Sequence, residues 1–399
     1  MYKLIDYSYS NAEPWNIPLE KRIKSIFDAK NKGLKVVVYL YEVADTSTFR
    51  YRVYNMCQSL ELSLEWRGTY FFKEELNTIS DYIDMFDSVI VVRFRWSIIF
   101  DRFIDKVKEA GKPVGFDVDD MIYNTNYIQM VMNTLSVDFD NELNYDYWFS
   151  YIGRIGESLK KCDFVITTND YIKEKMTNDL ELPGYIVPNF MNRLQLDSSN
   201  YYYEQKKKQY SREEFIIGYF SGTPSHINDF LTVAPELAQL LDACDHVKLR
   251  IVGFMELPLH FQKYVDRGQI ERIPLQNFVD LQKCIAEVDV NIVPLVNNEF
   301  SNCKSELKFF EAAVAGTITC ATPSYVFKEV IKSGENGFLC QPGEWFDTLL
   351  TLVRRQKQGD SAMVKEAQKI AINKYAYYNQ VNQLDAVLNQ ICGKTGGMN

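Results

Sequence analysis

The sequence has few of the residues that build metal centres and covalent frameworks. Its 399 residues include three histidines and eight cysteines. The cysteines lie far apart and form no C-x-x-C pair, so we expect small buried thiols in a reducing compartment rather than a disulfide framework or a zinc site. Three histidines are too few for a histidine-rich metal centre.

Long hydrophobic runs are also missing. No stretch approaches the roughly 18 to 20 consecutive apolar residues that a membrane-spanning helix needs. The first residues lack the basic-then-apolar pattern of a signal peptide, so we expect a cytoplasmic protein. Positive charge is not in excess, because 44 Lys and Arg stand against 53 Asp and Glu, a net charge of −9. This balance argues against nucleic acid as a partner.

Apolar and aromatic residues are plentiful. Hydrophobic residues make up 46% of the chain, which is typical of a folded globular protein and excludes a disordered or fibrous one. The length suggests two or three domains. The 26 tyrosines and 25 phenylalanines suit a well-filled core, and they also suit stacking on sugars or bases.

Short apolar runs alternate with helix-length amphipathic segments, the pattern of parallel sheets with crossover helices. Because the runs are continuously apolar, we expect strands that are covered on both faces. The expected strands are residues 34–40, 88–94, 113–119, 163–169, 185–189, 215–222, 247–253, 270–275, 290–295, 317–323 and 336–341. The expected helices are residues 49–61, 97–110, 142–161, 170–179, 228–243, 277–287, 304–315 and 343–357.

The pattern predicts an α/β protein with two doubly wound, Rossmann-like domains. The first comprises residues 1–192 and the second residues 215–358, and residues 193–214 are a polar linker without helical or strand periodicity. Residues 359–399 are helical and can pack back across the domains. In such sheets ligands bind beyond the carboxyl ends of the strands, so we expect the site in a central cleft between the domains.

The most informative stretch is residues 297–340. The helix that ends before Gly316 leaves free N–H groups at its start, and these form an anion site with Lys304 and Lys308. Glu311 lies on the same helical face, where a carboxylate can accept both hydroxyls of a ribose. A surface helix with ordinary charge pairs is the alternative. The N-cap candidates are Ser301, Asn302 and Ser305.

Three pieces of this half carry a family resemblance: EVDVNIVPL (287–295), KSELKFFEAAVAGTITCATP (304–323) and GENGFLC (334–340). Together they resemble the nucleotide-sugar domain of the group 1 (family 4) glycosyltransferases, which have the GT-B fold. VVYLYEVADTSTFRYRVYN (37–55), GFDVDDMIY (115–123) and YIVPNFMN (185–192) resemble a bacterial branch that builds capsule and O-antigen polysaccharides.

The resemblance implies a donor site in the second domain. Glu311 matches the second glutamate of the E-x7-E motif, which holds the donor's ribose, so its loss should weaken donor binding. The other implied donor residues are Ser305, Glu306 and Leu307 of the diphosphate-binding turn, Leu275 in the loop that meets the base, and Gly222 and Thr223 in the loop after the first strand.

Two departures from the family pattern affect this donor site. The first motif glutamate is replaced by Cys303, and Glu299 is the candidate to serve the donor sugar instead. The loop 218–229 lacks the usual Arg and Lys, so Lys304 and Lys308 are expected to compensate. His226 in that loop is either a contact to the donor phosphate or leaving group, or a plain loop residue.

The first domain should hold the acceptor. Its first loop, residues 42–52, lacks the family's glycines and offers Arg50 and Arg52 as acceptor-binding cations. The acidic residues that end a strand at the cleft are Asp117, which we assign to acceptor contact, and Asp119 and Asp120, which we assign to catalysis. Crowded carboxylates raise one another's pKa, which suits a general base. Binding of Mg²⁺ and capping of the next turn are the alternatives.

Residues 19–35 carry a local excess of positive charge. With Trp15, Ile23, Ile26 and Phe27, this segment could rest on the inner face of the cell membrane, near a lipid-linked acceptor. An amphipathic helix with one solvated face explains it equally well.

The sequence therefore predicts a glycosyltransferase of the hexosyltransferase type. It would move a sugar from a nucleoside-diphosphate donor to a saccharide acceptor, without a tightly bound cofactor or metal. The resemblance implies retention of anomeric configuration, whereas a true base among the aspartates would permit inversion. The alternatives are a GT-B nucleotide-sugar 2-epimerase, a non-catalytic binding partner of an active transferase, and a phosphatase-type metal site.

Overall fold

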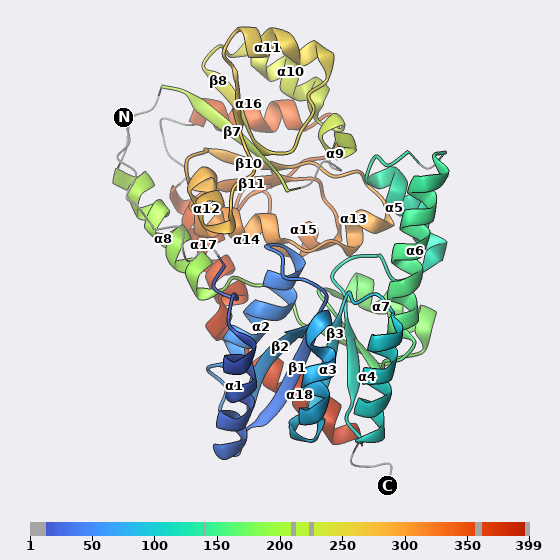
Figure 1. Cartoon of the computed structure of the whole chain (residues 1–399). Coiled ribbons are helices and arrows are strands. Elements are labelled where there is room, and N and C mark those ends of the chain that lie inside the picture. The colour runs from blue at the N-terminus through green and yellow to red at the C-terminus, as the bar shows by residue number, and fades with distance from the viewer. Residues whose placement is uncertain (1–12, 139, 209–212, 223–226, 356–360, 396–399) are drawn as a thin grey trace.

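The computed structural model describes residues 13–138, 140–208, 213–222, 227–355 and 361–395. These residues form two parallel, six-stranded β-sheets that are covered by helices. Figure 1 shows the two sheets one above the other, with the N-terminal sheet below. The predicted fold class, two Rossmann-like domains followed by C-terminal helices, is confirmed.

The first sheet has the strand order β2-β1-β3-β4-β5-β6. Its strands are β1 (Lys35–Tyr41), β2 (Trp66–Phe72), β3 (Ser88–Val92), β4 (Val114–Asp117), β5 (Phe164–Thr167) and β6 (Gly184–Ile186). Its helices are α1 (Leu19–Asn31), α2 (Asn55–Leu60), α3 (Leu76–Ile79), α4 (Ile98–Glu109), α5 (Ile128–Thr134), α6 (Glu142–Leu159) and α7 (Asp170–Leu180). A π-helical turn, η2 (Arg50–Tyr54), leads into α2, and short 3₁₀ turns are η3 (Lys73–Glu75), η4 (Ser80–Met85) and η5 (Thr125–Tyr127).

Strand β2 was not among the predicted strands. Its sequence, WRGTYFF, contains polar and small residues and is therefore not a continuous apolar run. The strand forms because all seven of its residues pair with β1. Gly68 lets α2 approach closely, since a Cβ atom there would lie 2.9 Å from Cys57 Cα.

The second sheet has the order β12-β11-β10-β7-β8-β9, and its six strands lie where the apolar runs predict them. They are β7 (Phe215–Ser221), β8 (Val247–Gly253), β9 (Ile270–Ile273), β10 (Val290–Val293), β11 (Ile318–Ala321) and β12 (Phe338–Leu339). The helices are α9 (Ile227–Leu231), α10 (Ala234–Ala243), α11 (Gln262–Asp266), α12 (Phe278–Ala286), α13 (Glu299–Cys303), α14 (Leu307–Val314), α15 (Tyr325–Val330) and α16 (Trp345–Arg355), with the 3₁₀ turn η7 (Leu259–Phe261).

The segment predicted as an irregular linker is mostly helical. Residues Arg193–Lys208 form α8, which packs against α12 of the second domain. The prediction failed because the face that α8 buries consists largely of polar residues, including Gln195 and Ser199, so the helical period carries little hydrophobic signal.

The C-terminal helices return across both domains. Helix α17 (Ser361–Tyr375) packs on α14 of the second domain, and α18 (Val381–Thr395) contacts α2 of the first, with the 3₁₀ turn η8 (Tyr377–Asn379) between them. The indole N–H of Trp66 donates to Asn389 Oδ1 at 3.0 Å, which fastens α18 to the N-terminal sheet. In Figure 1 this red segment runs from the upper domain down to the lower one.

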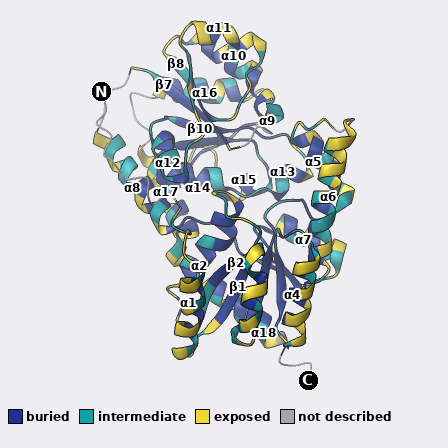
Figure 2. Cartoon of the chain, viewed as in Figure 1, coloured by how far each residue is buried: buried dark blue, intermediate teal, exposed yellow. Residues whose placement is uncertain are grey.

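One hydrophobic cluster is continuous between the two domains. It joins residues of the first sheet, such as Tyr39, to α14 and α15 of the second domain and to α17 and α18. The buried interior in Figure 2 follows both sheets and the helices between them. None of the helices in the described ranges combines the length and apolar character that crossing a bilayer requires.

Candidate functional site

The predicted helix over residues 304–315 starts three residues later, at Leu307, after a turn that joins it to a separate short helix. Helix α13 ends at Cys303 and α14 begins at Leu307. The cap of α13 is Asn298, whose side chain accepts from Ser301 N at 2.8 Å. None of the three predicted N-cap residues serves as an N-cap: Ser301 and Asn302 lie within α13, and Glu306 occupies the N-cap position of α14 without a side-chain cap bond. Lys304 therefore precedes α14, while Lys308 and Glu311 lie on it.

This turn presents several hydrogen-bond donors without partners. Among the described residues, the backbone N–H groups of residues 305–308 have no acceptor. The Ser305 hydroxyl is buried and also has no hydrogen-bond partner there. Neither Lys304 nor Lys308 has a carboxylate within 4 Å in the described chain. Lys304 lies over the Phe300 ring and Lys308 over the Tyr219 ring. Free N–H groups at a helix start with two cations beside them make an anion site.

The pKa of Lys308 reflects this enclosure. The pKa of Lys308 is lowered to about 8, chiefly by burial and also by the neighbouring Lys304, while Asp229 and Glu311 act in the opposite direction. A bound anion would restore the ordinary preference of lysine for the charged form. The site thus holds a cation at neutral pH that forms no close ion pair with any described carboxylate.

The first domain also holds the turn in place. Asn169 caps α7 through Oδ1, which accepts from Ile172 N at 3.1 Å. Its Nδ2 donates to the backbone oxygens of Cys303 and Lys304, both at 3.3 Å. The first domain thus binds the carbonyl oxygens of the turn, which leaves the N–H groups of the turn free for a ligand.

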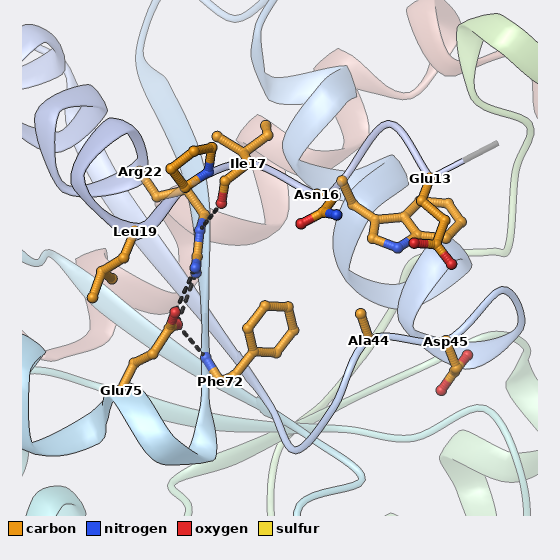
Figure 3. A pocket seen from close by; sticks show the side chains of 11 residues that line it. Glu13, Asn16, Ile17, Leu19, Arg22, Ala44, Asp45, Phe72 and Glu75 are labelled. Atoms are coloured by element: carbon orange, nitrogen blue, oxygen red, sulfur yellow. Dashed lines mark hydrogen bonds and ion pairs between the residues drawn. The ribbon is translucent and has the colours of Figure 1, made fainter. Parts of the chain in front are cut away.

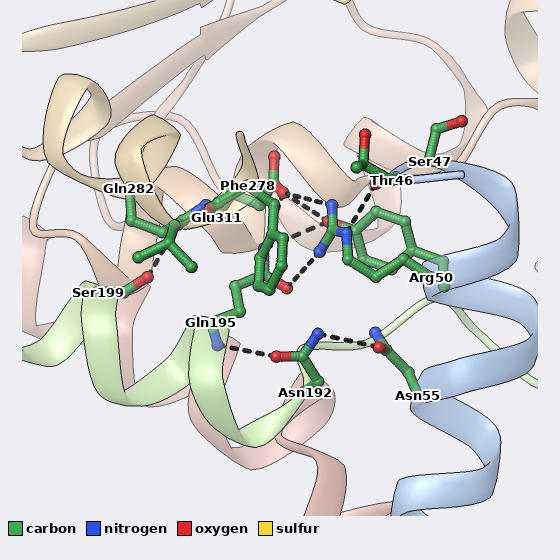
Figure 4. A network of polar contacts seen from close by, with 12 residues as sticks. Thr46, Ser47, Arg50, Asn55, Asn192, Gln195, Ser199, Phe278, Gln282 and Glu311 are labelled. Atoms are coloured by element: carbon green, nitrogen blue, oxygen red, sulfur yellow. Dashed lines mark hydrogen bonds and ion pairs between the residues drawn. The ribbon is translucent and has the colours of Figure 1, made fainter. Parts of the chain in front are cut away.

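Glu311 lies at the centre of a buried polar network that joins the domains (Figure 4). Its Oε1 accepts hydrogen bonds from the Tyr51 hydroxyl of the first domain and from Gln195 Nε2 of α8, the latter at 2.8 Å. Arg50 Nη2 lies 3.8 Å from the same oxygen. Among the described residues, Oε2 of Glu311 has no hydrogen-bond partner, so one carboxylate oxygen remains for a ligand.

Arg50, predicted to bind the acceptor, is instead part of this network. Its Nη1 donates to Gln195 Oε1 at 2.9 Å and its Nε to the Thr46 carbonyl at 2.8 Å. The guanidinium also lies over the rings of Tyr51 and Phe278. Arg50 is buried and committed to these partners, so we correct its role to orienting Glu311.

Arg52 and Asp117, also predicted to contact the acceptor, bind each other. Nε and Nη2 of Arg52 donate to the two carboxylate oxygens of Asp117 at 2.8 and 2.7 Å. Arg52 is 0% exposed and Asp117 1% exposed. Neither side chain reaches a ligand in this arrangement, and we correct both to an internal support beneath the strand ends. Burial raises the pKa of Asp117, although Arg52 lowers it.

Asp119 and Asp120 lie at the strand ends, but they are not a bare acidic cluster. Arg93 Nε lies 2.9 Å from Asp119 Oδ1, and Arg93 Nη2 lies 3.3 Å from Asp120 Oδ2. Arg93 also donates to the Thr48 hydroxyl at 3.0 Å. Burial alone lowers the pKa of Arg93, yet the two carboxylates raise it above its ordinary value. Sequence reasoning missed Arg93, although its position at the end of an apolar strand was a usable signal.

The acids of the first domain approach the turn of the second. Burial raises the pKa of the Cys303 thiol, and the nearby Asp120 carboxylate raises it further. Cys303 is completely buried and packs into the core of the first domain, so it fills the position of the missing motif glutamate with apolar contact. Glu299, expected to serve the donor sugar, pairs with Lys175 of α7 at 2.7 Å.

Glu306 and Leu307 belong to the turn in different ways. The Glu306 side chain points to α17, where its Oε1 accepts a hydrogen bond from the Tyr375 hydroxyl. Only its backbone N–H is therefore placed for an anion. Leu307 begins α14 and packs partly against the interdomain core.

Three loops at the carboxyl ends of β7, β8 and β9 lie together. Gly253 has φ +95°, and a Cβ atom there would lie 2.0 Å from the Ser221 carbonyl, so only glycine permits this approach. Leu275 and Phe254 are exposed beside it, and a Cβ atom at Gly222 would meet nothing within 4 Å. Two exposed apolar side chains are therefore available to a ligand at these strand ends. Thr223 and His226, predicted in the same loop region, lie outside the described residues.

A pocket of about 390 Å³ lies at the carboxyl ends of β1 and β2 (Figure 3). Phe72 and Asn16 line it, and Arg22 forms a bidentate pair with Glu75 at its wall. Arg22, Trp15 and Ile26 are buried, which corrects the idea that this segment offers them to a membrane surface. Helix α1 is the amphipathic helix of the alternative prediction.

Within the described ranges, no group of three or more His, Cys, Asp or Glu side chains is placed to hold a metal ion. Asp117, the third acid of the predicted cluster, is turned away into its pair with Arg52.

Comparison with known proteins agrees with this geometry. Residues 214–355 match the family model of group 1 glycosyl transferases. No curated protein matches the chain. Among solved structures, a glycosyltransferase from Rickettsia africae is similar at 12% identity and a TM-score of 0.62, over 90% of this chain and 98% of that one.

Two further structures share the fold. HepE of Anabaena, in complex with UDP and glucose, is 13% identical with a TM-score of 0.56, over 88% of this chain and 99% of that one. Sucrose-phosphate synthase of Thermosynechococcus elongatus is 12% identical with a TM-score of 0.59, over 90% and 100%. Residues 214–355 thus resemble a group 1 glycosyl transferase domain, and the chain as a whole has the two-domain GT-B fold.

Proposed function

We propose that this protein transfers a glycosyl residue from a nucleoside-diphosphate sugar to a hydroxyl of a saccharide acceptor. The second domain would bind the donor and the first domain the acceptor. No metal or other cofactor takes part in this proposal. The observation that carries it is the turn before α14, where free N–H groups, the Ser305 hydroxyl, Lys304 and Lys308 converge with no described carboxylate within 4 Å of either lysine.

The turn suits a leaving diphosphate. As the glycosidic bond to the donor breaks, negative charge grows on the phosphate oxygens, and preorganised donors stabilise that charge at little reorganisation cost. Glu311 Oε2 would accept from the ribose, while Leu275 and Phe254 would flank the base. Contact between the domains would exclude water and favour transfer over hydrolysis.

Thermal unfolding with UDP, GDP, dTDP and CMP tests donor binding, with their sugar conjugates as further ligands. A ligand present at 100 times its Kd stabilises a protein by about 2.7 kcal/mol, which gives a clear shift in Tm. We expect a shift with UDP, because HepE, which shares the fold, binds UDP and UDP-glucose. If no nucleotide shifts the transition, the donor site is wrong.

Donor affinity should depend on pH through Lys308. The lysine is charged below its pKa of about 8, and the diphosphate remains anionic over this range. Affinity should therefore be constant from pH 6.5 to 7.5 and should fall as pH rises through 8. Calorimetric titration with UDP would measure it. The Lys308→Met variant should bind weakly at every pH, and an equal pH dependence in that variant would contradict the assignment.

Glu311→Ala should weaken UDP binding by about 1.5–3 kcal/mol, because the ribose loses a charged acceptor. Tyr51→Phe removes only the hydrogen bond to Oε1, so its effect on UDP binding should be several times smaller. Calorimetric titration of both variants compares them directly. Unchanged affinity in a folded Glu311→Ala protein would exclude the ribose contact.

We further propose that the reaction retains anomeric configuration. Asp119 and Asp120 are both engaged by Arg93, which favours a leaving phosphate over a side chain as the acceptor of the proton. Proton NMR of the first product formed would report the anomer. An inverted product would assign the base role to one of these aspartates.

The acceptor that we propose is a growing bacterial surface polysaccharide, soluble or lipid-linked, reached from the cytoplasmic side. The sequence resemblance in residues 37–55 and 115–123 supports this proposal. On α1, Phe27 stays exposed among lysines, a small surface for peripheral contact with a membrane. Flotation with anionic vesicles would test that contact.

A non-catalytic binding partner is the second candidate. Cys303 in place of the motif glutamate, together with the capping of Glu311 Oε1 by Tyr51, favours it. Incubation with the donor that shifts Tm separates the two functions. An active transferase should at least hydrolyse that donor slowly, whereas a binding partner should hold it unchanged.

A further inference from the structure

Helix α6 exposes an unusual number of large apolar side chains. Leu143 is 78% exposed, Tyr147 58% and Phe149 49%, and Tyr145 is exposed as well. Figure 2 shows exposed residues along the first turns of α6, which stand at one side of the molecule beside α5. A soluble protein rarely gathers such side chains in one place without a ligand or partner.

The exposed side chains form two rows on the helix. Leu143, Tyr147 and Tyr151 are spaced four residues apart and lie on one side; we call them the Tyr147 row, of which Tyr151 is only partly exposed and packs against the core of the first domain. Tyr145 and Phe149 form a second row on a different side. Between these sides, Ile152 and Ile155 are buried against the body of the first domain. Figure 1 shows α6 running from α5 down along the first domain.

The Tyr147 row leads to the proposed reaction centre. The centroids of the Tyr147 and Tyr151 rings lie 6.1 Å apart with an interplanar angle of 14°, so the two rings stack on each other and hold each other in place. Arg95 lies over the Tyr151 ring, 5.7 Å from its centroid. Burial raises the pKa of Tyr151, and Arg93 is close enough to lower it. Arg93 is the residue that holds Asp119 and Asp120, so the row begins where the acceptor hydroxyl would react.

The charge around the row selects among possible occupants. Residues 135–153 contain no Lys or Arg, and Asp138, Glu142 and Asp146 are exposed there. Carboxylates repel the phosphates of anionic lipids and nucleic acids. They accept hydrogen bonds from hydroxyl groups, while the apolar face of a sugar ring stacks on an aromatic side chain. This combination fits a neutral, hydroxyl-rich chain.

We propose that the Tyr147 row binds the distal sugars of an extended oligosaccharide or polysaccharide acceptor. This inference rests on the proposed function for the position of the reacting end, which lies beside Arg93. Sugars next to that end would meet Tyr151, and those farther along the chain would meet Tyr147 and Leu143. The substrate class is therefore a glycan chain of several residues, and a monosaccharide would use only the inner part of the site.

Binding to an array of immobilised glycans, one to about ten residues long, tests the inference. We compare the wild-type chain with Tyr147→Ala and with Phe149→Ala, a matched aromatic deletion on the second row. The wild type should bind at least one glycan class, with longer members bound more tightly. Tyr147→Ala should weaken binding of the long members about three- to tenfold, as expected for one lost aromatic contact. Phe149→Ala should bind as the wild type does.

Each other outcome would overturn the inference. The first is that the wild type binds no glycan on the array. The second is that Tyr147→Ala and Phe149→Ala lose equal binding affinity, and the third is that Tyr147→Ala loses as much affinity for monosaccharides as for longer chains. Two other occupants of the Tyr147 row are tested separately: sedimentation detects a second copy of the chain, and vesicle flotation detects a membrane. Self-association, or binding to phosphatidylcholine vesicles, that disappears in Tyr147→Ala would assign the row to a second copy or to a membrane instead.

Failure of the proposed function has a different signature. The UDP-induced shift in Tm reports the donor site, which Tyr147 does not touch. A missing shift together with length-dependent glycan binding would reject the transferase and keep the Tyr147 row as a glycan surface. A normal UDP-induced shift in Tm, together with no binding to any glycan on the array, would reject the Tyr147 row as a glycan surface and keep the proposed transferase.

Discussion

Arg52→Ala should lower the free energy of unfolding by about 3–5 kcal/mol, the largest loss of stability that we expect from a single change. The substitution leaves the carboxylate of Asp117 buried without its two charge-assisted hydrogen bonds. It also frees the Val187 carbonyl, to which Arg52 Nη1 donates at 2.7 Å. The loss reflects an uncompensated buried charge and is larger than the net contribution of the intact pair.

Urea-induced unfolding followed by circular dichroism measures this effect. Lys160→Ala, which removes an exposed pair with Glu157, is the matched control and should leave the midpoint nearly unchanged. A double variant, Arg52→Met with Asp117→Leu, removes both charges and should recover part of the lost stability. An Arg52→Ala protein as stable as the wild type would show that Asp117 reaches solvent or a ligand, as the sequence had suggested.

Lys308→Met should reduce the transfer rate about 100- to 1000-fold, the effect of losing one preorganised donor to developing charge. The same change should stabilise the free protein. Lys308 is held at a pKa of about 8, below its ordinary value, mainly because it is buried. An apolar side chain of similar length keeps the packing and removes the cost of burying the charge.

The sign of the pH dependence distinguishes this explanation from a change in packing. Between about pH 8 and the ordinary lysine pKa, the unfolded chain binds more protons than the folded one, so this group makes the wild type more stable as pH rises. Below pH 8 the penalty is fully present, and the gain in the Lys308→Met variant should be largest there. Lys328→Met, an exposed lysine on α15 of the same domain, should change neither the rate nor the stability. A Lys308→Met enzyme with normal turnover would remove Lys308 from the site.

Most of the fold could be predicted from local sequence. Strands that are covered on both faces must be apolar throughout, and eleven such runs appear where the structure has strands. Strand β2 was not predicted, because Gly68 and its polar neighbours interrupt the apolar pattern. Gly68 instead allows close contact with α2. Helix α8 escaped for a related reason, since it buries Gln195 and Ser199 in hydrogen bonds. Polar side chains that are buried through hydrogen bonds produce no hydrophobic periodicity in the sequence.

Part of the candidate site could also be predicted from the local sequence. Lys308 and Glu311 lie on one short helix, so their spacing alone predicted that they share a face. The partners of these residues come from elsewhere: Tyr51 is 260 positions from Glu311, and Asp117 is 65 positions from Arg52. Nothing in a local pattern indicates whether an arginine or an aspartate faces a ligand or another side chain.

By itself, the sequence determined the two doubly wound domains and the free N–H groups at the start of α14, because the first depend on hydrophobic periodicity and the second are left unpaired at every such helix start. Only the tertiary structure decided the roles of the charged residues. It pairs Arg52 with Asp117 and Arg93 with Asp119 and Asp120, and it leaves Lys304 and Lys308 without a carboxylate within 4 Å among the described residues. The physical reason is that a buried charge takes its function from the partner that folding brings to it, and that partner lies on a different strand or in a different domain.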